Sequence, residues 1–138
     1  MRYLFGDWDK IKKNLSNKYI MLFLDYDGTL TPIVERPAKA VIPQETKSAL
    51  ADLVRNPKIK IAIVSGRALQ DVKGRVRIKD VIYIGNHGLE IEGPKIKFTK
   101  PVSTKQRAVL EKIKKDLTEE LSSIKGVILE DKGLSLSV

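Results

Sequence analysis

Three apolar runs divide the first two thirds of the chain, and each ends at a short polar turn. The runs are Tyr19–Leu24, Ile59–Val64 and Val81–Ile84. Unbroken or nearly unbroken apolar runs of this length are typical of strands in a parallel sheet, and that of Tyr19–Leu24 predicts burial on both faces. The turns that follow are Asp25-Tyr26-Asp27-Gly28-Thr29, Ser65-Gly66-Arg67 and Gly85-Asn86-His87-Gly88. Because the carboxyl ends of parallel strands meet at one edge, the pattern predicts an α/β fold with its functional residues there.

Helical patterns lie before and between these runs. The N-terminal one comprises Leu4, Trp8, Ile11 and Leu15. After a loop from Pro37, Pro43 begins a helix that ends at Asn56-Pro57. Its predicted apolar face comprises Ala49, Leu50, Leu53 and Val54. A weaker helical pattern over Ala68–Val76 is interrupted by Gly74.

The pattern changes after the third run. Segments 89–91 and 96–98 flank Gly93-Pro94 and predict a small hairpin, and Thr99–Val102 reads as a linker. A long helix capped by Ser103 or Thr104 then follows, which we expect Gly126 to end. Its apolar stripe comprises Leu110, Ile113, Leu117, Leu121 and Ile124. Val127–Glu130 and Leu134–Val138 predict a second hairpin, so the sequence suggests two domains, 1–101 and 102–138.

From the composition we expect a folded protein, and we expect it in the cytoplasm. The 138 residues are 42% hydrophobic and 31% charged, which is enough apolar content for a core. No run approaches a membrane span, Met1–Asn14 lacks a signal-peptide core, and there is no cysteine. The net charge of +9 comes from scattered Lys and Arg with few aromatics, which argues against nucleic acid and is typical of a solvated surface. A positive field would also favour capture of a small anion.

The strongest chemical signal is the pair of carboxylates after the first apolar run. Asp25 and Asp27 are two residues apart, so on extended backbone they point to one side, about 6.6 Å apart along the strand. Two carboxylates directed at one site suit a divalent cation such as Mg²⁺ or an acid/base pair. The alternative is a loop of solvated aspartates that only ends a strand.

The other two turns supply groups that suit a phosphate. Ser65 and Gly66 place a small hydroxyl and an unhindered backbone at the end of the second run. His87, the only histidine, lies between glycines at the end of the third. A lone histidine is more often structural than catalytic, so both substrate contact and loop scaffolding remain open for His87.

The sequence Asp25-Tyr26-Asp27-Gly28-Thr29-Leu30 after an apolar strand resembles the first motif of the haloacid dehalogenase superfamily of phosphatases. With Thr31-Pro32-Ile33, Ser65-Gly66-Arg67 and Gly85–Glu90, the likeness narrows to the trehalose-6-phosphate phosphatase family. The resemblance implies a Rossmann-like parallel core, incomplete here, followed by the start of an α+β cap domain. It also implies Mg²⁺-dependent hydrolysis of trehalose 6-phosphate through an aspartyl-phosphate.

The resemblance also assigns roles to individual residues. It makes Asp25 the nucleophile and Asp27 the acid and base, with both near Mg²⁺. It makes Thr29, Ser65 and Gly66 phosphate ligands. Contacts to the sugar phosphate are implied for Arg67, Asn86, His87, Glu90, Glu130 and Lys132. For Glu130 and Lys132 the alternative is an exposed hairpin turn.

Two parts that the resemblance implies are absent from the sequence: a downstream lysine and an acidic Gly-Asp-Asp motif that completes the Mg²⁺ site. The strand Tyr19–Leu24 should then lie at an open sheet edge, which invites self-association. We therefore expect a truncated, weakly active or inactive part of a phosphatase. A non-catalytic or self-associating module, and a phosphatase for another sugar phosphate, are the alternatives.

Overall fold

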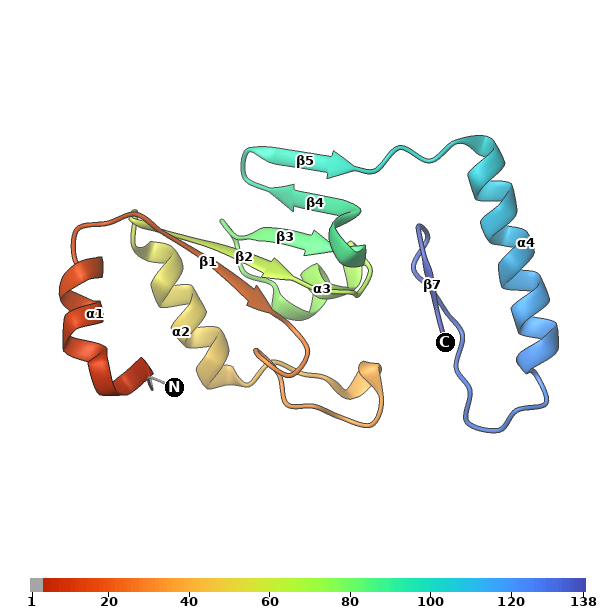
Figure 1. The fold of residues 1–138 in the computed structure, drawn as a ribbon, viewed down its shortest axis with the longest axis horizontal. Coiled ribbons are helices and arrows are strands. Elements are labelled where there is room, and N and C mark those ends of the chain that lie inside the picture. The colour runs from red at the N-terminus through yellow and green to blue at the C-terminus, as the bar shows by residue number, and fades with distance from the viewer. Residues whose placement is uncertain (1–3) are drawn as a thin grey trace.

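The three apolar runs form neighbouring strands of one sheet, as the sequence predicts. The computed structural model describes residues 4–138, and its five-stranded sheet has the order β1-β2-β3-β4-β5 (Figure 1). The strands are β1 (Ile20–Asp25), β2 (Ile59–Val64), β3 (Ile82–Gly85), β4 (Glu90–Gly93) and β5 (Ile96–Thr99). The first three are parallel, and β4 and β5 add an antiparallel hairpin at the far edge.

The helices follow the predicted order, with two corrections. Up to β5 they are η1 (Leu4–Asp7), α1 (Trp8–Leu15), η2 (Pro37–Lys39), α2 (Gln44–Arg55), α3 (Leu69–Val76) and η3 (Asn86–Gly88). Gly74 does not interrupt α3, because a glycine inside a helix costs only about 1 kcal/mol and tertiary packing overrides it. Ala49 of the predicted apolar face of α2 is exposed, whereas Leu50 is buried.

Helices α2 and α3 cover the same face of the sheet. Strand side chains that alternate onto this face are Leu22 and Leu24 of β1, Ile61 and Ile63 of β2, and Tyr83 of β3. They pack against Leu50 from α2 and against Leu69, Val72 and Val76 from α3 in one hydrophobic cluster. This face therefore contains the core of the described structure.

The opposite face of the sheet is also apolar, but it is largely open. Met21 and Phe23 of β1 share it with Phe98 of β5, and their side chains are 41%, 64% and 43% exposed. The prediction that β1 is buried on both faces is therefore wrong, because only one face of the sheet carries helices among residues 4–138. The prediction of an open edge is confirmed, since β1 ends the strand order.

The C-terminal part stands at the far end of the molecule from α1 (Figure 1). Ser103 caps α4 (Thr104–Leu121) through a reciprocal pair of hydrogen bonds with Gln106. The helix ends at Leu121, short of Gly126, and its predicted stripe is only partly covered, with Ile113 exposed. The hairpin is shorter than predicted, β6 (Glu130–Asp131) and β7 (Leu136–Ser137), and the division into domains 1–101 and 102–138 stays a prediction. Within residues 4–138, no helix has the length and apolar character to cross a membrane.

Candidate functional site

Backbone hydrogen bonds bring the turns after the three parallel strands together. Tyr26 N–H donates to the carbonyl of Val64 at 3.2 Å, which places the turn after β1 beside the end of β2. Ser65 N–H donates to the carbonyl of Ile84 at 2.9 Å, which joins the end of β2 to β3. The polar residues that follow each strand therefore share one edge of the sheet, as expected for parallel strands.

A pocket of about 330 Å³ opens at this edge. Its lining includes Asp27 and Gly28 from the first turn, Gly66 and Arg67 from the second, and Glu130 and Lys132 from the C-terminal hairpin. Core and hairpin residues that lie more than sixty positions apart in the chain thus meet in one cavity. Five of the residues that the sequence singles out contribute to this lining: Asp27, Gly66, Arg67, Glu130 and Lys132.

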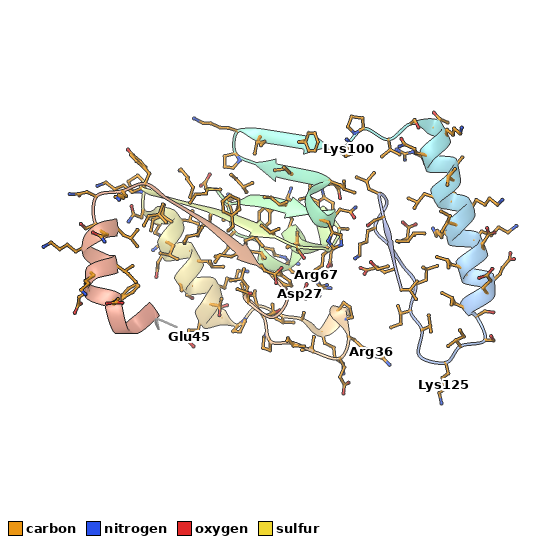
Figure 2. All side chains as sticks on the ribbon, in the orientation of Figure 1. Asp27, Arg36, Glu45, Arg67, Lys100 and Lys125 are labelled. Atoms are coloured by element: carbon orange, nitrogen blue, oxygen red, sulfur yellow. The ribbon has the colours of Figure 1, made fainter. Side chains whose placement is uncertain are left out.

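Arg67 lines the pocket and joins several of its neighbours through hydrogen bonds. Its guanidinium donates from Nε and Nη2 to the two carboxylate oxygens of Asp27 at 2.8 and 2.7 Å. It also donates to Asp71 at 3.0 Å and to the carbonyl of Pro37 at 2.8 Å, and it lies 5.3 Å from the ring centroid of Tyr26. The side chain is only 7% exposed, and the hydrogen bonds that it donates to Asp27 and to Asp71 raise the pKa of Arg67 above its ordinary value. Figure 2 shows Arg67 and Asp27 side by side at the tip of β1.

This geometry bears on the roles that the resemblance implies for Arg67, a substrate ligand, and for Asp27, a proton donor. Most donors of Arg67 are already used within the protein, which leaves little for direct contact with a substrate. A protonated Asp27 would give up at least one of its two charge-assisted hydrogen bonds. The role of Arg67 as a substrate ligand and that of Asp27 as a proton donor stay predictions, and the pair has to loosen for either.

The donor set for Mg²⁺ is incomplete but compatible with the ion. Asp25 is exposed at the end of β1, and Asp27 follows it on the pocket side. Among residues 4–138 no group of three or more His, Cys, Asp or Glu side chains is arranged around a common point. Mg²⁺ is often held by one or two carboxylates with water and substrate phosphate, so Asp25 and Asp27 could hold it only in part.

The second turn is built around a buried serine and a crowded glycine. The Ser65 hydroxyl is buried and accepts from the backbone N–H of Arg67 at 3.1 Å, which tightens the turn. A Cβ on Gly66 would lie 2.6 Å from the ring of His87, so the ring covers the glycine. His87 is exposed, in the left-handed region at φ 57°, and its N–H donates to the carbonyl of Ser65 at 3.3 Å. His87 therefore lies against the second turn without lining the pocket.

Asn86 and Glu90 do not line the pocket. Asn86 is fully buried, with φ 53°, and its N–H donates to the carbonyl of Arg67 at 2.7 Å. Its Nδ2 donates to Glu90 at 3.4 Å and to the carbonyl of Lys132 in the C-terminal hairpin at 3.0 Å. Glu90 also accepts weakly from the N–H of Leu69 at the start of α3, at 3.5 Å.

The structure adds three residues that sequence reasoning missed. Thr31, rather than the exposed Thr29, is buried, and its hydroxyl donates to the carbonyl of Tyr26 at 3.1 Å. Asp71 pairs with Arg67 four positions before it, a helical spacing that the sequence does display. Ser135 bonds Asn86 across 49 residues, and no local pattern indicates such a contact.

Comparison with solved structures shows the class of protein to which this fold belongs. A "haloacid dehalogenase-like hydrolase" of Bacillus subtilis matches 72% of the chain with a TM-score of 0.52 and 27% identity. The C-terminal domain of the Candida albicans trehalose-6-phosphate phosphatase matches 93% of this chain and 45% of that one, with a TM-score of 0.74 and 30% identity. The fold is that of the haloacid dehalogenase class.

The family follows from the sequence matches. The family model for trehalose-phosphatase matches residues 23–138. Trehalose-phosphate phosphatase B of Arabidopsis thaliana is 35% identical over 95% of this chain, and trehalose 6-phosphate phosphatase RA3 of Zea mays is 34% identical over 88%. The chain belongs to the trehalose-phosphatase family, and it spans 37% of the length of each of these two relatives.

Proposed function

We propose that this chain carries the phosphate-reacting part of a phosphatase that hydrolyses trehalose 6-phosphate to trehalose and phosphate. The observation that supports it most is the pocket in which Asp27 and Gly66 of the core face Glu130 and Lys132 of the hairpin. The backbone of a glycine turn suits the oxygens of a phosphoryl group, and a carboxylate beside it suits a divalent cation that accompanies the phosphate. The Glu130–Lys132 pair, 3.6 Å apart, suits the hydroxyls at the other end.

In this proposal Asp25 attacks phosphorus, and the bond between phosphorus and the sugar oxygen breaks. Asp27 gives its proton to the departing sugar oxygen. A water then attacks the aspartyl-phosphate and loses its proton to Asp27, which releases phosphate and restores Asp25. Thr29, Ser65 and Gly66 would hold phosphate oxygens, and Arg67, Asn86, His87 and Glu90 would support the substrate. Mg²⁺ held in part by Asp25 and Asp27 would supply charge that offsets the repulsion between a carboxylate and a phosphate.

The isolated chain should turn over little trehalose 6-phosphate. Losing one preorganised charge partner costs about 3 kcal/mol, or roughly two decades in rate, and the sequence lacks both the lysine and the acidic motif. The test is phosphate release with saturating Mg²⁺ beside Asp25→Asn, combined with an NMR titration by the same substrate. We expect shifts at Gly28, Gly66 and Lys132 with minimal release. Absence of any binding at these residues would contradict the proposal, whereas fast turnover abolished by D25N would support it and overturn the expected weakness.

A second candidate is a non-catalytic module that self-associates through its sheet edge. The free edge of β1 and the exposed Phe23 beside it favour this alternative. Sedimentation velocity across a hundredfold range of concentration would distinguish a monomer from such an assembly. A substrate other than trehalose 6-phosphate would show itself in the same titration as tighter binding of another sugar phosphate.

A further inference from the structure

The amide of Asn86 is used by the protein itself. The residue is 0% exposed, and its Nδ2 donates to the backbone carbonyl of Lys132 at 3.0 Å. Its Oδ1 accepts a short hydrogen bond from the hydroxyl of Ser135, and Glu90 takes a second, longer bond from Nδ2 at 3.4 Å. Both ends of the amide therefore contact the turn of the C-terminal hairpin, and the side chain has no open path to a ligand.

The hairpin needs this contact because its own pairing is minimal. Strands β6 and β7 contain two residues each, and a hairpin this short has little stability alone. Its turn is closed by one backbone bond, from Lys132 N–H to the carbonyl of Ser135 at 2.9 Å. From the other side, Lys114 of α4 pairs with Asp131 at 2.6 Å on a partly exposed surface. Among the side-chain hydrogen bonds of residues 4–138, those that join the hairpin to the core run through Asn86.

The same hairpin carries two residues of the pocket, Glu130 in β6 and Lys132 in the turn. Glu130 and Lys132 both line it, and the Lys132 side chain is 9% exposed, donating to the hydroxyl of Ser137 at 2.8 Å. Asn86 holds the main chain of Lys132 itself, not a distant part of the hairpin. A change in this contact therefore moves the amino group of Lys132 relative to Asp27.

We propose that Asn86 and Ser135 are positioning residues, which fix the hairpin on the core and so set where Glu130 and Lys132 stand over the pocket. The proposal rests on the proposed function for the identity of the ligand, a sugar phosphate. It assigns Asn86 an indirect role in place of direct substrate contact. In this proposal the hairpin contacts only the sugar end of the ligand. Discrimination between a sugar phosphate and bare phosphate then depends on the contact between Asn86 and Ser135.

The first test measures the contact without a ligand. Amide hydrogen exchange of residues 130–137 is compared between wild type, Ser135→Ala and Ser123→Ala, a serine of the exposed turn after α4. We expect S135A to raise exchange by about fivefold or more, the equilibrium factor for one ordinary hydrogen bond, and S123A to leave it unchanged. Ser135→Thr, which keeps the hydroxyl, should restore slow exchange. Equal exchange in S135A and S123A would overturn the proposal.

A double-mutant cycle between Asn86 and Ser135 tests whether Ser135 acts through Asn86. Asn86→Gly removes the amide while tolerating the left-handed backbone, so the fold can be retained. On the N86G background, S135A should have little further effect on hairpin exchange. Full additivity of the two changes would show that Ser135 acts through another group, and would contradict the proposed pair.

The second test uses the ligand and separates the two proposals. Trehalose 6-phosphate and inorganic phosphate are titrated with Mg²⁺ into wild type, S135A and S135T. We expect S135A to weaken trehalose 6-phosphate about fivefold and to leave inorganic phosphate unchanged, with S135T close to wild type. Equal weakening of both ligands would overturn the positioning role. If neither ligand binds wild type, the proposed function fails, while the exchange data still decide whether Asn86 and Ser135 hold the hairpin.

Discussion

The two faces of the sheet have similar apolar composition but different surroundings. One face carries Leu22, Leu24 and Ile63 under helices α2 and α3, in a continuous core. The other carries Met21 and Phe23, which are largely exposed. The difference shows that an apolar run allows both faces of a strand to be buried. Whether a face is buried depends on which other elements pack against it.

The largest contrast should come from truncating one large side chain on each face. Ile63 is fully buried, so Ile63→Ala should lower the free energy of unfolding by about 2–5 kcal/mol. Phe23→Ala on the open face should cost about 1 kcal/mol or less, because the removed atoms are already in contact with water. Urea denaturation followed by circular dichroism measures both. Equal losses at the two positions would mean that the open face is covered in solution.

A smaller effect is expected where the sheet meets α3. A Cβ on Gly85 would lie 2.6 Å from backbone atoms of Leu69, which cannot move without shifting the helix. Gly85→Ala should therefore destabilise the packed face by about 1–3 kcal/mol. Gly74→Ala is the matched control, since its Cβ would meet no atom within 4 Å and alanine favours the helix. A stable G85A protein with unchanged thermal midpoint would refute the close approach.

The packed side should also respond to acid. Burial raises the pKa of Asp71, but hydrogen bonds from Arg75 and Arg67 outweigh it and bring the pKa below its ordinary value. Because the folded pKa is lower than the unfolded one, this stabilisation is complete at neutral pH. It is lost as pH falls below about 4, through the folded pKa.

Asp71→Asn should reduce this acid dependence while lowering stability at pH 7. Thermal midpoints measured between pH 7 and pH 3 test the change, with Asp52→Asn at an exposed position of α2 as the control. An unchanged slope in D71N would show that other carboxylates dominate acid unfolding.

The smallest effect on stability is expected for a charge on the open face. Phe23→Lys should change the free energy of unfolding by about 0.5 kcal/mol, since the position is solvated. It should also suppress any concentration-dependent association through β1, because a lysine at an edge strand opposes pairing. Sedimentation of wild type and F23K at matched concentrations checks this. Association that persists in F23K would point to a surface other than β1.

Much of the fold was predictable because its signals are local. The strand β2 has the bounds that its apolar run predicts, and β1 and β3 are displaced by one residue. The position before a periodic helix limited the cap of α4 to Ser103 or Thr104, and the structure has Ser103 as the cap. The length of the hairpin of β6 and β7 was overestimated. Alternation in Leu134–Val138 indicates a strand, but it does not indicate how many of its residues pair with the other strand.

The candidate site was predictable as a set of residues, but not as a set of contacts. The sequence determined the turns that follow each parallel strand and, through its motifs, the trehalose-phosphatase family. Only the tertiary structure decided that Arg67 pairs with Asp27, 40 positions away in the chain. It also decided that Asn86 bonds Lys132 of the hairpin, 46 positions away. Local patterns report the period of a helix or strand and the chemistry of a turn. Partners distant in the chain meet only when the sheet and hairpin are assembled, so their pairing has no local signal.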